Sequence, residues 1–185
     1  MWFGRWQNIQ NVCRTKTDKE ADGFPRGLCA ADWKPSALVF PSNLVYNFTV
    51  MKEYVVFDLE WNQNPYGKEL PGAHLTFEII EIGAVKLNEN MEVISTFSQL
   101  VRPQVYRELH YKISQVTHMT MDELMEKGRP FQEVMADFEE WCGEAAVYCT
   151  WGPMDLTELE KNLAYFGMEN PFPNPLLYYD IQKLY

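Results

Sequence analysis

Residues 54–62 read YVVFDLEWN, in which an apolar run ends in a pair of carboxylates. The first four residues are aromatic or β-branched, which is typical of a buried strand. Side chains alternate between the two faces of a strand, so Asp58 and Glu60 are expected to point the same way while Leu59 points into the core. The sequence therefore predicts two carboxylates side by side at the end of a buried strand.

Such a pair of carboxylates indicates a metal site. Two neighbouring carboxylates repel each other and are costly to desolvate. A cation between Asp58 and Glu60 would remove both penalties, and Mg²⁺ takes ligands of this kind together with substrate phosphates. The pair predicts metal-assisted phosphoryl chemistry, although Asp-x-Glu at a strand end also occurs without a metal.

The composition fits one folded domain with a sizeable core. The chain has 185 residues, of which 46% are hydrophobic and 15% aromatic. Its four cysteines have no C-x-x-C spacing, so we expect free thiols, without disulfides or a zinc site, in a reducing compartment. No segment has 18 uninterrupted apolar residues, which predicts a cytoplasmic protein without a membrane span.

Acidic residues dominate the later part of the chain. Residues 1–50 hold six Lys/Arg and four Asp/Glu, whereas residues 51–185 hold ten and twenty-two. A protein that binds duplex nucleic acid usually shows a basic face, which this pattern does not indicate. If the substrate is nucleic acid, bound metal ions and a local patch must attract it, which suits a few end nucleotides.

The first fifty residues differ in pattern from the rest. Glycines, prolines and tryptophans occur there without helical or strand spacing, and Met51 stands just before the first predicted strand. We favour the hypothesis that residues 1–50 are an irregular extension that is not native, with Met51 as the natural start. The alternative is a native arm that packs on the domain.

From residue 51 the sequence alternates between strand and helix patterns, which indicates an α/β fold. Three strands are expected to form an antiparallel meander, and a fourth, after a helical region, to run parallel to the first. Thr120 and Glu123 have the spacing of a helix-capping box. The predicted strands are 53–59, 77–87, 93–101, 145–151 and 176–179, and helices are predicted to begin at 120, 130, 155 and 180.

The order of these elements resembles the DEDD exonuclease superfamily, in its DEDDh or DnaQ-like form with 3′–5′ polarity. The Asp-Leu-Glu-Trp-Asn run and the Trp-Gly-x-x-Asp form are most similar to the Eri-type branch, which includes histone-mRNA exonucleases. The resemblance implies a ribonuclease H-like fold, a mixed five-stranded sheet flanked by helices. The stretches that carry it are YVVFDLEWN (54–62), FEIIEIGAVKL (77–87), ISQVTHMTMDEL (113–124), GRPFQEVMADFEEW (128–141) and WGPMDLTELEKNL (151–163).

The resemblance also implies a set of site residues. In this family four carboxylates bind two ions, Mg²⁺ or Mn²⁺, and Asp58, Glu60 and Asp155 match three of the four. Taken alone, Asp155 is better explained as an ordinary helix N-cap. In the family's arrangement, two ions about 3.5–4 Å apart clamp the scissile phosphate. The three residues are therefore expected to be both catalytic and metal-binding.

Three further residues are candidates for binding substrate. Trp61 and Asn62 follow the acidic pair, where a 3′-terminal base could stack or form a hydrogen bond. For Trp61 the alternative is a place at the edge of the core. His74 lies in the loop after the first strand, from which it could approach the substrate.

The family places its fourth carboxylate five residues after a histidine that acts as general base, near the C-terminus. The chain ends at Tyr185, before that motif, so residues 51–185 match an incomplete exonuclease domain without its C-terminal helix. This end indicates a truncated sequence or a broken reading frame. His118 is no substitute for the base, because it precedes Asp155, and we expect it at the surface or at a helix entry.

The expected function is hydrolysis of phosphodiester bonds at the 3′ end of single-stranded nucleic acid, RNA ahead of DNA, by two-metal-ion catalysis that releases nucleoside monophosphates. One alternative is a catalytically inactive nucleic-acid-binding or protein-binding module on the same fold. Another is a fragment that does not fold stably.

Overall fold

The computed structural model describes residues 53–65, 75–143, 146–172 and 178–184. The chain divides into two units, Met1–Thr49 and Val50–Tyr185, and every described residue belongs to the second. The predicted extension at residues 1–50 therefore lies outside the described residues.

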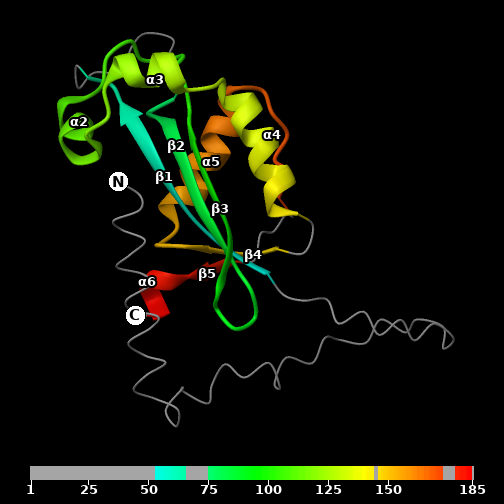
Figure 1. Ribbon diagram of the computed structural model, residues 1–185. Coiled ribbons are helices and arrows are strands. Elements are labelled where there is room, and N and C mark those ends of the chain that lie inside the picture. Colours follow the sequence, from blue (N-terminus) through cyan, green and yellow to red (C-terminus); the bar gives the residue numbers. More distant parts are fainter. Residues whose placement is uncertain (1–52, 66–74, 144–145, 173–177, 185) are drawn as a thin grey trace, which may run out of the picture. The chain divides into compact units, whose positions relative to one another are not determined.

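The described strands form one mixed sheet in the order β3-β2-β1-β4-β5 (Figure 1). The first three strands pair antiparallel as a meander, β4 pairs parallel with β1, and β5 pairs parallel with β4. This confirms the predicted meander and the parallel fourth strand. The strands are β1 (Glu53–Gln63), β2 (Phe77–Leu87), β3 (Val93–Leu100), β4 (Ala146–Thr150) and β5 (Tyr178–Asp180).

Helices follow β3 and β4, as the sequence predicts. At the start of α3, the Thr120 side chain accepts a hydrogen bond from the Glu123 N–H at 3.2 Å, as the capping-box spacing indicates. Figure 1 shows α2 and α3 near the end of the meander where β1 terminates. The helices are α2 (Tyr111–Thr117), α3 (Met121–Lys127), α4 (Phe131–Cys142), α5 (Met154–Tyr165) and α6 (Ile181–Leu184).

The main core lies on one face of the sheet, under α4 and α5. Val55, Phe57 and Leu59 alternate along β1 into a cluster with apolar residues of both helices. Leu59 is buried, as predicted, and Asp58 and Glu60 are half-buried on the opposite face. The alternation of β1 thus separates the core from the acidic pair.

A buried glutamate on β2 fixes the loop that follows β3. Glu78 Oε1 accepts hydrogen bonds from the Gln104 and Val105 N–H groups, the second at 2.8 Å, and Oε2 accepts one from Tyr106 at 3.0 Å. Burial raises the pKa of Glu78, and these three hydrogen bonds lower it. The chain ahead of α2 therefore has a defined path.

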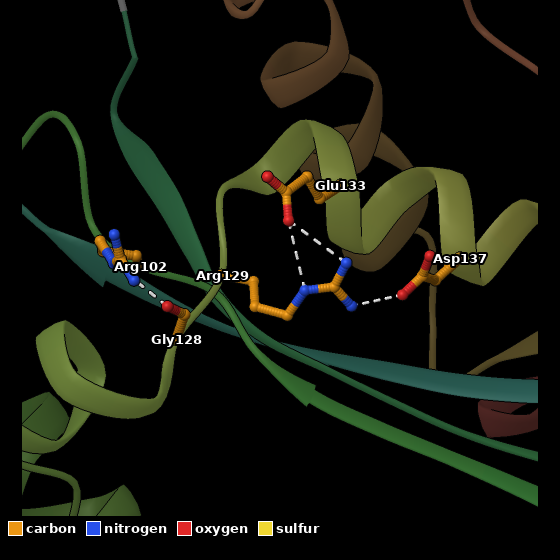
Figure 2. Close-up of polar contacts among 5 residues, drawn as sticks. All are labelled: Arg102, Gly128, Arg129, Glu133 and Asp137. Atoms are coloured by element: carbon orange, nitrogen blue, oxygen red, sulfur yellow. Dashed lines mark hydrogen bonds and ion pairs between the residues drawn. The ribbon is translucent and has the colours of Figure 1, made fainter.

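The segment between α3 and α4 extends the end of β3. The Arg129 N–H donates to the Leu100 carbonyl at 3.0 Å, and the Arg102 N–H donates to the Arg129 carbonyl at 2.8 Å. Val101 and Arg129 form a parallel β-bridge. In Figure 2, Arg102 Nε also donates to the Gly128 carbonyl, at 3.1 Å. Arg129 therefore pairs with the end of β3 through a single bridge.

The Arg129 side chain continues from this bridge to α4. Figure 2 shows its guanidinium between the carboxylates of Glu133 and Asp137, both on α4. All three side chains are well exposed to solvent, so these ion pairs contribute little to stability, about 0–1 kcal/mol each. The backbone bridge is the stronger connection.

Two cysteines fall in the described part of the chain. Cys142 and Cys149 are both buried and free. Burial raises the pKa of each thiol to about 12, so both remain protonated at neutral pH. Among the described residues, no helix is long and apolar enough to span a membrane.

Candidate active site

The structure brings the three predicted carboxylates together at the middle of β1. Asp58 and Glu60 project from one face of the strand, on either side of Leu59 in sequence. Asp155 lies in the first turn of α5, is only 4% exposed, and its Oδ1 accepts a hydrogen bond from the Leu59 N–H at 3.1 Å. This bond ties α5 to the strand position between the two acidic residues.

The three carboxylates share one electrostatic environment. Burial, together with the negative charge of Asp58, raises the pKa of Asp155 to about 7. The Leu59 N–H lowers this pKa, while the charge of Glu60 raises it. Positive charge at this place would relieve both the desolvation of Asp155 and its repulsion by Asp58 and Glu60.

The donor set fits a hard divalent cation. All three side chains offer carboxylate oxygens, the ligands that Mg²⁺ and Mn²⁺ prefer. As placed, no group of three or more His, Cys, Asp or Glu side chains within the described ranges is arranged to hold a metal ion. Cation binding would therefore draw these side chains closer together.

The turn before Asp155 is held by a residue of β5. Gly152 has φ +86°, a left-handed conformation that favours glycine. Its N–H donates to Asp180 Oδ1 at 3.1 Å, and its carbonyl accepts from Thr150 Oγ1 at 2.7 Å. Sequence reasoning missed Asp180, whose place at the end of the strand beside β4 was the available signal. Asp180 thus positions the turn that carries Asp155.

Replacing Asp180 by Ala is expected to lower the free energy of unfolding by about 1–2 kcal/mol, because the partly buried Gly152 N–H loses its acceptor. Asp180→Asn keeps an acceptor oxygen and should lose less than half as much. Urea unfolding of the two variants measures the difference. Equal losses would mean that the charge of Asp180, through its ion pair with Lys183, is what matters.

Asn62 is placed inside the protein rather than at a surface open to substrate. It is 0% exposed, its Nδ2 donates to the Glu108 carbonyl at 2.9 Å, and its Oδ1 accepts from the His110 N–H at 2.9 Å. Both ends of the carboxamide are therefore used in anchoring the entry to α2. As placed, Asn62 anchors the segment ahead of α2 and is not exposed to a nucleotide, in contrast to the predicted role in substrate binding.

Trp61 and the histidines complete the set of candidates. Trp61 is half-buried and packs on the main core, with its ring 5.9 Å from that of Phe77, which matches the alternative of a core-edge residue. His74 lies outside the described residues. His118 caps the end of α2 and is exposed, in agreement with the expected surface position.

The family model described as "Exonuclease", of the RNase T type, matches residues 55–182. The chain belongs to this exonuclease family. Curated relatives include the PolC-type DNA polymerase III of Staphylococcus aureus (strain bovine RF122 / ET3-1) and of Staphylococcus epidermidis (strain ATCC 12228 / FDA PCI 1200), each 35% identical over 94 residues. Those residues are 50% of this chain and 6% of each relative, so the match spans a small part of the polymerases.

Solved exonuclease structures have the same fold. The nuclease domain of 3′hExo, a DEDDh family member bound to rAMP, aligns with TM-score 0.60 and 22% identity over 73% of this chain and 69% of that one. E. coli exonuclease I in complex with a dT13 oligonucleotide aligns with TM-score 0.52 and 14% identity over 65% and 25%. With the family match, these likenesses confirm the predicted DnaQ-like exonuclease membership and ribonuclease H-like sheet, and the Eri-type branch agrees with them.

Proposed function

We propose that this exonuclease-family protein cleaves phosphodiester bonds stepwise from the 3′ end of single-stranded nucleic acid and releases nucleoside monophosphates, with RNA preferred over DNA. The observation that carries the proposal is that Asp155, bonded to the Leu59 N–H, lies within electrostatic reach of Asp58 and Glu60. Support for the substrate comes from relatives whose structures hold rAMP or a dT13 oligonucleotide.

Asp58, Glu60 and Asp155 would hold two divalent ions, Mg²⁺ or Mn²⁺. When bound, the ions would supply positive charge for the scissile phosphate and for activation of the attacking water. The protein's part is to keep three carboxylates on one strand face and one helix turn, with Asp155 oriented by the Leu59 N–H. The Asp180 contact to Gly152 holds the turn from which Asp155 projects.

The entry to α2, residues 107–112, is a small patch that carries more positive than negative charge. It carries Arg107 and Lys112, both exposed, and one acidic residue. Tyr111 is 61% exposed, with Lys112 Nζ 6.0 Å from its ring centroid. Asn62 ties this segment to the end of β1. We propose that the substrate strand stacks a base on Tyr111 and sets phosphates against the two cations.

Replacing Tyr111 by Ala is expected to raise the KM for a single-stranded 12-mer about tenfold, because base–aromatic stacking contributes about 1–3 kcal/mol. The kcat should change little, since Tyr111 is not one of the three carboxylates that would hold the ions. Val116→Ala is the matched control, because Val116 is a similarly exposed apolar residue of the same helix, at 57%. An unchanged KM for the Tyr111 variant would remove this patch from the substrate path.

The proposed function is tested with 5′-labelled single-stranded RNA and DNA of the same sequence, incubated with the protein and Mn²⁺. We expect a ladder that shortens from the 3′ end, faster for RNA, and no shortening with Asp58→Asn. Circular dichroism of both proteins controls for folding. Absence of shortening with the wild-type protein, together with retained oligonucleotide binding, would favour the inactive binding module.

A further inference from the structure

Glu81 of β2 is a buried carboxylate that the three-carboxylate site does not include. It is 6% exposed and lies directly opposite Glu60 in the β1–β2 pairing. Directly opposed residues of antiparallel strands point to the same face, with Cβ atoms about 4.5–5.5 Å apart. Glu81 therefore shares the face of the sheet that carries Asp58 and Glu60.

The side chain of Glu81 is anchored from β3 and lies within electrostatic reach of Asp58 on β1. Its Oε1 accepts a hydrogen bond from Ser98 Oγ at 3.3 Å, and Ser98 is the β3 partner of Gly83. Gly83 is in turn the β2 residue opposite Asp58, and without a side chain it leaves room beside that carboxylate. Burial raises the pKa of Glu81, and the charge of Asp58 adds to the effect, in agreement with two carboxylates within electrostatic reach.

The second oxygen of Glu81 has no structural use among the described residues. Its Oε2 is buried and forms no hydrogen bond there. A buried acceptor without a donor costs about 1–3 kcal/mol, and like charges placed opposite each other in a sheet are also destabilising. Glu78, three residues earlier, provides the contrast, because three backbone N–H groups satisfy it. A purely structural role would have given Glu81 similar partners.

We propose that Glu81 is a fourth acidic residue of the divalent-cation site, acting from the neighbouring strand. It adds negative charge, and its Oε2 accepts a hydrogen bond from a water of the cation's hydration shell. Mg²⁺ keeps several of its waters when proteins bind it. The inference rests on the proposed function, because it requires a cation at Asp58, Glu60 and Asp155.

The test is a titration of the purified full chain with Mn²⁺ alone, with free Mn²⁺ followed by electron paramagnetic resonance. Glu81→Gln is expected to raise the dissociation constant about tenfold or more, the size of effect typical of groups around a metal's ligands. Glu81→Asp keeps the charge and should recover most of the affinity. Ser98→Ala removes the hydrogen bond to Oε1 but leaves the charge, so its affinity should stay within about twofold of wild type.

Melting curves in EDTA identify a variant that fails to fold, and Glu81→Gln should melt no lower than wild type because it removes a buried charge. If Glu81→Gln binds Mn²⁺ as tightly as wild type while Asp58→Asn does not, the inference about Glu81 is wrong and the proposed function stands. If the wild-type protein binds no Mn²⁺, or Asp58→Asn binds it equally well, the cation site itself fails and the role of Glu81 fails with it.

Discussion

Replacing Asp155 by Asn is expected to abolish nuclease activity and, in EDTA, to stabilise the protein. Activity should fall at least about 100-fold, since even groups that only support metal ligands account for 10–100-fold. Stability should rise because Asn keeps an oxygen for the Leu59 N–H while it removes a buried charge that Asp58 and Glu60 repel. We expect a gain of about 2 kcal/mol at pH 7.5.

The gain in stability from Asp155→Asn should increase with pH. The pKa of Asp155 is about 7 in the folded protein against 3.8 as its ordinary value, so between these limits the folded state binds the proton more tightly. The stability contributed by Asp155 is therefore full below pH 4 and is lost as the pH rises through 7. The advantage of Asp155→Asn should be small at pH 4 and largest at pH 7.5, in metal-free buffer.

Urea unfolding in EDTA at several pH values measures this effect. Glu160→Gln is the matched control, because Glu160 is an exposed acidic residue of the same helix and should change stability by less than about 0.5 kcal/mol. A less stable Asp155→Asn variant would mean that the carboxylate is a structural cap of α5, the alternative that the sequence left open.

Replacing Gly128 by Ala is expected to cost about 3 kcal/mol of stability. A Cβ at this position would lie 2.3 Å from the Leu124 carbonyl oxygen, 2.7 Å from the Arg102 nitrogen and 2.9 Å from the Val101 carbonyl carbon. All three are backbone atoms, so no side chain can turn aside to make room, and overpacking of a rigid site is costly. The bridge between Val101 and Arg129 would have to open.

Urea unfolding of Gly128→Ala beside Arg102→Ala distinguishes backbone crowding from loss of a side-chain contact. Arg102 donates to the Gly128 carbonyl from an exposed position, as Figure 2 shows, so its loss should cost less than about 1 kcal/mol. If the two variants lose the same stability, the side-chain hydrogen bond, and not the close backbone approach, joins α3 to the sheet.

Local patterns were sufficient to predict the β1 face. The alternation that buries Leu59 and places Asp58 and Glu60 on the opposite face follows from strand geometry alone. The bounds of β2, Phe77–Leu87, also agree with the prediction. β1 runs to Gln63, beyond the predicted end at residue 59. A register shift between Glu60 and Trp61 lets the strand continue past the acidic pair, and no local signal marks it.

The site features that could not be predicted from the sequence depend on pairings between distant segments. Asn62 was expected to meet substrate, but its partners lie 46 and 48 residues away, at Glu108 and His110. Glu81 stood inside a correctly predicted strand, yet its relation to the acidic pair depends on a register that composition does not specify. The role of Asp180 was equally unpredictable, because this residue acts on the turn after β4 only through the parallel β4–β5 pairing.

The bond between Leu59 and Asp155 joins residues 96 positions apart. Contacts between such distant residues form late in folding, because a long loop must first close. On a ribosome that adds about 5–20 residues per second, the acidic pair of β1 emerges roughly 5–20 seconds before α5. During that interval the growing chain carries two of the three carboxylates of the site. The third carboxylate, Asp155, can join the other two only after α5 has been synthesised.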